Sequence, residues 1–74
     1  MVVQVRLFAT LREGRFKRKE IKFPEGSRLG DLLNSLGILE NQTGIMLVNG
    51  RHTSAEHELS ASDVVSIFPS IGGG

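Results

Sequence analysis

The sequence lacks cysteine altogether. This absence excludes disulfide bonds, thiolate metal sites and thiol nucleophiles together. The sequence also lacks any apolar run near the roughly 20 residues that would cross a membrane. Its apolar start is interrupted at Gln4 and Arg6, so no signal peptide is visible. We therefore expect a cytoplasmic protein.

Groups suited to metal binding or covalent catalysis are also scarce. The two histidines, His52 and His57, have Glu56 and Glu58 nearby, but a metal site needs three or four converging ligands. We expect two solvent-facing histidines and no metal. No serine comes with a recognisable base and orienting acid. The same scarcity argues against nucleophilic catalysis by this chain.

With 74 residues and a net charge of +1, the chain is expected to form one small domain with little room for a deep active site. The charge is uneven, because residues 1–28 hold eight Lys/Arg against three acids. The densest basic run covers residues 15–19 and includes Phe16. Such a run could contact nucleic-acid phosphates or an acidic partner surface. Over nucleic-acid contact we favour an interpretation in which it protects an exposed strand edge from pairing, and docking to an acidic partner surface is compatible with that interpretation.

Alternating side chains predict the first two strands. Val3, Val5 and Leu7 alternate with polar residues, which places Phe8 on the polar side of the first strand. Residues 20–23 alternate again and end in a turn at residues 24–26. We expect these strands to pair as an antiparallel hairpin.

A helix is predicted next, because the leucines recur at i, i+3, i+4 and i+7: Leu29, Leu32, Leu33 and Leu36. Ser27 is placed to cap its first turn, and Gly37 to end its last. We expect about ten helical residues. A polar loop over residues 40–44 follows.

Three further segments complete the predicted sheet. The apolar run 45–48 is typical of a central strand buried on both faces, and Asn49-Gly50 predicts a tight hairpin into a short strand at 51–53. Residues 54–62 form a loop anchored by Leu59, and 63–68 form the last strand, in which Val65 and Ile67 share one face. The result is an α+β domain with one helix across a mixed sheet of four to five strands, the first and last strands lying parallel at its centre.

The last residues, Gly72, Gly73 and Gly74, have no side chains to pack, so we expect a domain at residues 1–69 followed by a flexible tail at 70–74. We also expect a free α-carboxylate on Gly74, whose reference pKa of about 3.3 to 3.7 leaves it ionised and nucleophilic toward the α-phosphate of a nucleotide. From Pro69 onward the chain can reach roughly 20 Å. The alternative is an idle flexible terminus.

Taken together, these features resemble β-grasp, ubiquitin-like sulfur carriers of the MoaD/ThiS type, and most of all the small subunit of molybdopterin synthase. The most specific segment is 68–74, Phe-Pro-Ser-Ile-Gly-Gly-Gly, which is similar to the family's ending of Phe-Pro-Pro, an aliphatic residue, a small residue and Gly-Gly. Residues 5–13 are similar to the family's first strand and the loop after it. Two segments depart from the pattern. Ser70 replaces the second proline, and residues 60–63 replace an Asp-Gly-Asp-like turn.

The resemblance implies a carrier with no catalytic residue on this chain and no stably bound cofactor. An E1-like partner would adenylate Gly74 with ATP, and a sulfur donor would convert the adenylate to a thiocarboxylate. Gly72 and Gly73 would line the partner's channel. Phe8, Phe68, Pro69 and Ile71 would bind a sulfur-accepting partner, such as the large subunit of molybdopterin synthase. Sulfur transfer to thiamine or another product, conjugation to lysines, and a plain protein-binding module remain alternatives.

Overall fold

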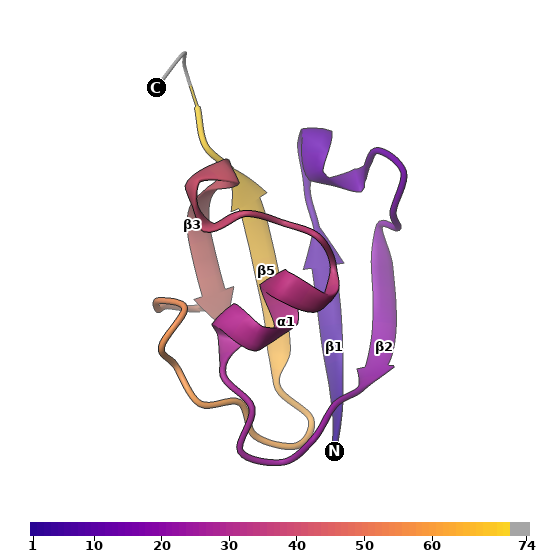
Figure 1. Ribbon diagram of the computed structural model, residues 1–74, viewed down its shortest axis with the longest axis vertical. Coiled ribbons are helices and arrows are strands. Elements are labelled where there is room, and N and C mark those ends of the chain that lie inside the picture. Colours follow the sequence, from indigo (N-terminus) through magenta and orange to yellow (C-terminus); the bar gives the residue numbers. More distant parts are fainter. Residues whose placement is uncertain (72–74) are drawn as a thin grey trace.

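One mixed sheet of five strands, in the order β2-β1-β5-β3-β4, forms the body of the protein. It is seen in the computed structural model, which describes residues 1–71 (Figure 1). The elements, in chain order, are β1 (Val2–Leu7), a 3-10 turn η1 (Ala9–Arg12), β2 (Arg18–Lys22), α1 (Leu29–Ser35), a 3-10 turn η2 (Glu40–Gln42), β3 (Thr43–Val48), β4 (Arg51–His52) and β5 (Val64–Pro69).

The first and last strands lie side by side at the centre of the sheet. They pair in parallel, with Val5 opposite Val65 and Leu7 opposite Ile67. β1 pairs with β2, and β5 with β3, in antiparallel fashion. The predicted β-grasp architecture is confirmed, because α1 crosses one face of this sheet while no helix of residues 1–71 covers the other face (Figure 1).

The core lies between α1 and the sheet. The alternation in β1 and β5 turns one set of side chains toward the helix, and the leucines of α1 cover them. The fully buried members from these three elements are Val3, Val5, Leu7, Leu29, Leu32, Leu33, Val65 and Ile67. The predicted faces of both strands are therefore confirmed.

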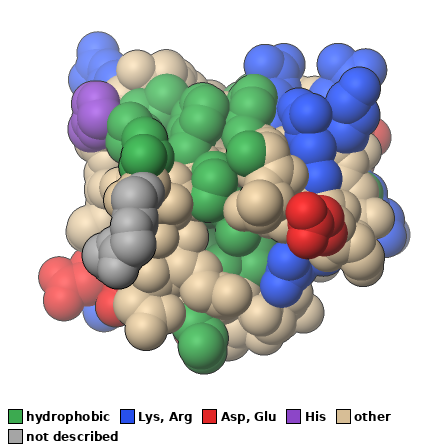
Figure 2. Space-filling view, turned by 90° about the horizontal axis from the view of Figure 1, so that it is seen from above, with side chains coloured by type: hydrophobic (Ala, Val, Ile, Leu, Met, Phe, Trp, Pro, Cys, Tyr) green, Lys and Arg blue, Asp and Glu red, His purple; other side chains and the backbone are tan. Residues whose placement is uncertain are grey.

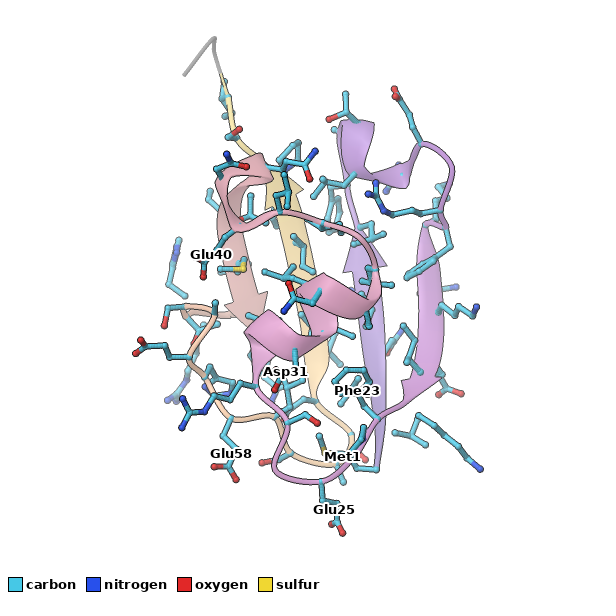
Figure 3. The ribbon with its side chains drawn as sticks, in the orientation of Figure 1. Met1, Phe23, Glu25, Asp31, Glu40 and Glu58 are labelled. Atoms are coloured by element: carbon cyan, nitrogen blue, oxygen red, sulfur yellow. The ribbon has the colours of Figure 1, made fainter. Side chains whose placement is uncertain are left out.

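The start of α1 differs from the prediction. Arg28, and not Ser27, is the N-cap residue, and Asp31 Oδ2 accepts a hydrogen bond from the Arg28 amide at 2.9 Å. Asp31 lies in the first turn of α1 (Figure 3). The Ser27 hydroxyl instead donates to the Pro24 carbonyl at 2.6 Å and closes the turn before the helix. A one-residue shift of the cap places an acid at the third helical position, where it satisfies a free backbone amide.

The end of α1 follows the prediction, but the helix is shorter. Gly37 has a φ of +71°, the left-handed conformation that stops a helix. The helix has seven residues and not about ten, because it begins only at Leu29 and Leu36 already serves as its C-cap.

The strand predicted from the apolar run is not buried on both faces. β3 lies next to the two-residue edge strand β4, and Ile45 is 42% exposed. Of residues 45–48, only Val48 is buried, at 6% exposure. β3 also begins earlier than predicted, at Thr43, because its first residues pair with the end of β5.

The tight turn and the loop anchor are confirmed. Asn49 and Gly50 both have positive φ, +53° and +82°, as a two-residue hairpin requires. Leu59 is buried in the middle of the long loop.

At the end of the sheet opposite to the C-terminal tail, the Met1 ammonium donates to the Phe23 carbonyl at 2.9 Å (Figure 3). Over residues 1–71, no helix has the length and apolar character needed to cross a bilayer.

Candidate functional site

The end of β5 is where the chain leaves the sheet (Figure 1). β5 ends at Pro69, and the Ser70 amide still donates to the Gln42 carbonyl at 3.0 Å. The next side chain, Ile71, is 91% exposed. The predicted tail residues Gly72, Gly73 and Gly74 lie outside the described residues, so their roles stay predictions.

Two phenylalanines stack beside this exit. The ring centroids of Phe8 and Phe68 lie 4.1 Å apart, with the planes inclined by 10°. The Phe8 amide donates to the Ile67 carbonyl at 3.2 Å, which extends the parallel pairing of β1 and β5 by one step. Two residues 60 positions apart in sequence thus form one flat apolar surface.

This surface lies on the face of the sheet away from α1. In the register, Ile45 is opposite Phe68, and Leu47 is opposite Ser66, so the β3 side chains continue the apolar area. Figure 2 shows hydrophobic side chains gathered in a band across this view, with Lys and Arg side chains on one flank. The predicted place of Phe8 and Phe68 on this face is confirmed, although their role in binding a partner stays a prediction.

Arginine and lysine side chains border the aromatic pair. The Arg12 Nε donates to the Leu7 carbonyl at 2.7 Å, and its guanidinium carbon lies 5.3 Å from the centroid of the Phe8 ring. This is the distance range of a cation–π contact. A shallow hollow next to it is lined by Phe8 and four cations, Arg6, Arg12, Lys17 and Arg18.

The basic run 15–19 divides into two parts with different tasks. Arg15 donates from its guanidinium to three backbone carbonyls, those of Leu11, Leu36 and Gly37, at 3.0 to 3.2 Å. It therefore closes the C-terminal end of α1, a role that sequence reasoning missed because the helix lies 21 residues away. Phe16 packs against the core.

The remaining residues of the run are exposed on β2 or just before it. β2 is an edge strand of the sheet, and Lys17, Arg18 and Lys19 lie at its start. Charged side chains at such an edge disfavour pairing with a second sheet. Their position on an edge strand therefore fits the edge-protection interpretation better than it fits contact with nucleic-acid phosphates.

The histidines do not assemble a site. Among residues 1–71, no group of three His, Cys, Asp or Glu side chains could hold a metal ion. His52 is exposed in β4, and the His57 carbonyl accepts a hydrogen bond from the Leu29 amide at 2.8 Å.

Comparison with known proteins places these features in a context. Residues 5–74 match the model of the ThiS family. Molybdopterin converting factor subunit 1 from Pyrococcus furiosus is 31% identical, with a TM-score of 0.78 over 96% of this chain and 99% of that one. Subunit 1 of the molybdopterin-converting factor from Helicobacter pylori, solved in complex with subunit 2, is 25% identical, with a TM-score of 0.67 over the whole of both chains. The small archaeal modifier protein 1 of Haloferax volcanii shares the fold at 22% identity, with a TM-score of 0.76 over 95% of this chain and 98% of that one.

Proposed function

This chain belongs to the ThiS family of small ubiquitin-like carriers, and we propose that it is a sulfur carrier for molybdopterin synthesis. In this proposal the Gly74 carboxylate is the group that carries the sulfur. A larger partner, equivalent to subunit 2 in the Helicobacter pylori complex, accepts the sulfur. This chain is then a co-substrate, and the catalytic residues lie on its partners.

The observation that carries the proposal is the position of the chain exit. β5, a central strand, ends beside the stacked Phe8 and Phe68, and Ile71 projects beyond it almost fully exposed. An apolar face next to an outgoing chain suits a protein that docks by its sheet and inserts its terminus into the partner. Exposed apolar surface of this kind typically marks a protein–protein contact.

The chemistry needs two steps at one carbon atom. A Gly74 carboxylate oxygen attacks the α-phosphorus of ATP on an E1-like enzyme, and pyrophosphate leaves. Hydrosulfide, the sulfur source at the same oxidation level, then attacks the carbonyl carbon of the acyl adenylate, the C–O bond to AMP breaks, AMP leaves, and loss of the S–H proton gives the thiocarboxylate. Because the chain has no cysteine, its terminal carboxylate is the position suited to hold the sulfur.

The test is an intact-mass measurement. The protein is incubated with ATP, an E1-like adenylating enzyme and a sulfur source. We expect the mass change of one oxygen replaced by one sulfur, located at Gly74 by fragmentation. A variant without Gly74 should keep its fold and remain unmodified. An unchanged mass with adenylating enzymes of both the molybdopterin and thiamine pathways would contradict the proposal.

The same experiment separates the alternatives. Loading by the thiamine-pathway enzyme alone would move the destination of the sulfur to thiamine. Isopeptide-linked adducts on lysines would indicate conjugation in the manner of ubiquitin. A protein-binding module with idle glycines would bind its partner equally well when residues 72–74 are removed.

A further inference from the structure

The start of β3 touches the chain exit more closely than any side chain would allow. A β-carbon built on Gly44 would lie 2.6 Å from the Pro69 carbonyl oxygen, 3.1 Å from the Ser70 α-carbon and 3.2 Å from the Pro69 carbonyl carbon. All three are backbone atoms, so no side-chain rotation relieves the clash. Glycine at position 44 thus permits direct backbone contact with Pro69, the last residue of β5, and with Ser70 after it.

Backbone conformation does not explain this glycine. Gly14, Gly26, Gly37 and Gly50 have positive φ and open space around them. Gly44 does not have a positive φ. It lies at a bulge in β3, because Thr43 is opposite Pro69 while Ile45 is opposite Phe68. A strand glycine of this kind marks a close approach of two backbones.

Hydrogen bonds hold η2 and the start of β3, the segment that faces Pro69 and Ser70, in place. The Gln42 carbonyl accepts from the Ser70 amide at 3.0 Å, and the Gln42 Oε1 accepts from the Leu39 amide at 2.7 Å. The Thr43 hydroxyl donates to the Glu40 carbonyl at 2.7 Å. η2 is therefore a braced turn, and the bulge at Gly44 brings it against the chain exit.

We propose that Gly44 is a positioning residue that lets η2 and the start of β3 clamp the chain at Ser70, so that Ile71 is the first unrestrained position. Beyond the clamp, residues 71–74 span at most about 14 Å when fully extended. The clamp fixes where that short segment starts and the direction in which it leaves, relative to the Phe8–Phe68 surface. The expected effect on adenylation rests on the proposed function. The contact that fixes Ser70 does not.

The structural part is tested by amide hydrogen exchange in Gly44→Ala. We expect the Ser70 amide to be protected in the natural protein and to exchange like an unstructured peptide in the variant. The control is Gly30→Ala, whose β-carbon would also be crowded by backbone, 3.2 Å from the Ala55 carbonyl oxygen, but in α1. Gly30→Ala should leave Ser70 protection unchanged. Equal Ser70 protection in the natural protein and Gly44→Ala would overturn the clamp.

The functional part is tested by adenylation kinetics. An unclamped Ser70 must be ordered when the partner binds, at a backbone cost that corresponds to roughly a five- to thirtyfold change in an equilibrium constant. We expect the KM of the adenylating enzyme for Gly44→Ala to rise within this range, with a smaller change in kcat. Adding Ser70→Pro to Gly44→Ala should recover part of the KM, because the proline ring fixes φ at that position. Loss of Ser70 protection with an unchanged KM would overturn the positioning role.

Two further outcomes remain decisive. Should Gly44→Ala fail to fold, Gln42→Ala takes its place, since it removes the brace to the Leu39 amide and is expected to weaken Ser70 protection and raise the KM to a lesser degree. Unchanged values in that variant would count against the clamp. Should the natural protein not be adenylated at all, the proposed function fails, while the exchange measurement still decides whether Gly44 fixes Ser70.

Discussion

The Asn49 side-chain amide donates to Asp63 Oδ1 at 2.9 Å and links the tight hairpin to the start of β5. The other oxygen of Asp63 accepts from the Ser60 amide at 2.8 Å, and Asn49 Oδ1 accepts from the Val64 amide at 2.9 Å. Asp63 is only 8% exposed. β5, the central strand that leads to the chain exit, therefore directly follows a buried carboxylate whose two oxygens both accept hydrogen bonds.

We predict that Asp63→Ala lowers the free energy of unfolding by about 1–3 kcal/mol, because it leaves the Ser60 amide and the Asn49 amide without their acceptor. Asp63→Asn should cost nearly as much, since its amide group would face the Ser60 donor. Urea unfolding measures both. If only Asp63→Ala lowered the free energy of unfolding, the volume of the side chain, and not its two acceptor oxygens, would be what stabilises the fold here.

Ser62 has a φ of +70° and precedes this carboxylate. A left-handed conformation costs a residue with a β-carbon roughly 1–2 kcal/mol, and glycine avoids most of that cost. We predict that Ser62→Gly raises the free energy of unfolding by about 0.5–1 kcal/mol, as measured by thermal or urea denaturation. Ser60→Gly, two residues earlier and not in this conformation, should lower it. Destabilisation by both substitutions would contradict the assigned backbone strain.

Arg15 is expected to be the one member of the basic run that matters for stability. Arg15→Ala removes three hydrogen bonds to the carbonyls of Leu11, Leu36 and Gly37 and should lower the free energy of unfolding by about 1.5–3 kcal/mol. Arg15→Lys keeps the charge near the helix C-terminus but not the planar fork, so an intermediate loss is expected.

The matched control for Arg15 is Arg18, which lies directly opposite Arg6 in the register. Like charges facing each other across strands are unfavourable. Arg18→Ala should therefore leave stability unchanged or raise it slightly. A loss as large as that of Arg15→Ala would show that overall positive charge, and not the bonds of Arg15, stabilises the fold.

The aromatic pair is predicted to matter for partner binding. Phe8→Ala should weaken binding to the sulfur-accepting subunit by at least about tenfold, because aromatic side chains at the centre of an interface commonly contribute 2 kcal/mol or more. Calorimetric titration measures the affinity. Val2→Ala is the control, since Val2 is an exposed apolar residue, 41% accessible, at the other end of β1. Equal effects of the two substitutions would remove the pair from the interface.

Much of the fold was predictable because it rests on local patterns. The alternation in Val3, Val5 and Leu7 and the leucine spacing of α1 each identify a face that must be buried. Asn49-Gly50 identified its hairpin, because few residues accept two successive positive φ values.

The errors arose where a contact that the residue pattern does not encode decides the outcome. Ile45 looked buried because its neighbours are apolar, but burial depends on what covers the open face. Ser27 looked like the cap of α1, but the Pro24 carbonyl takes its hydroxyl. The clamp at Gly44 was missed for the same reason, since the run around it is merely polar and its contact lies 25 residues further along the chain.

The sequence by itself determined the family, the order of the helix and the five strands, and the glycine-rich ending, because these depend on residue type and short-range spacing. Only the tertiary structure decided which residues surround that ending. The Phe8–Phe68 stack, the bonds from Arg15 to Leu36 and Gly37, and the contact of Gly44 with Pro69 each join segments at least 20 residues apart, and no local preference specifies the register that brings them together.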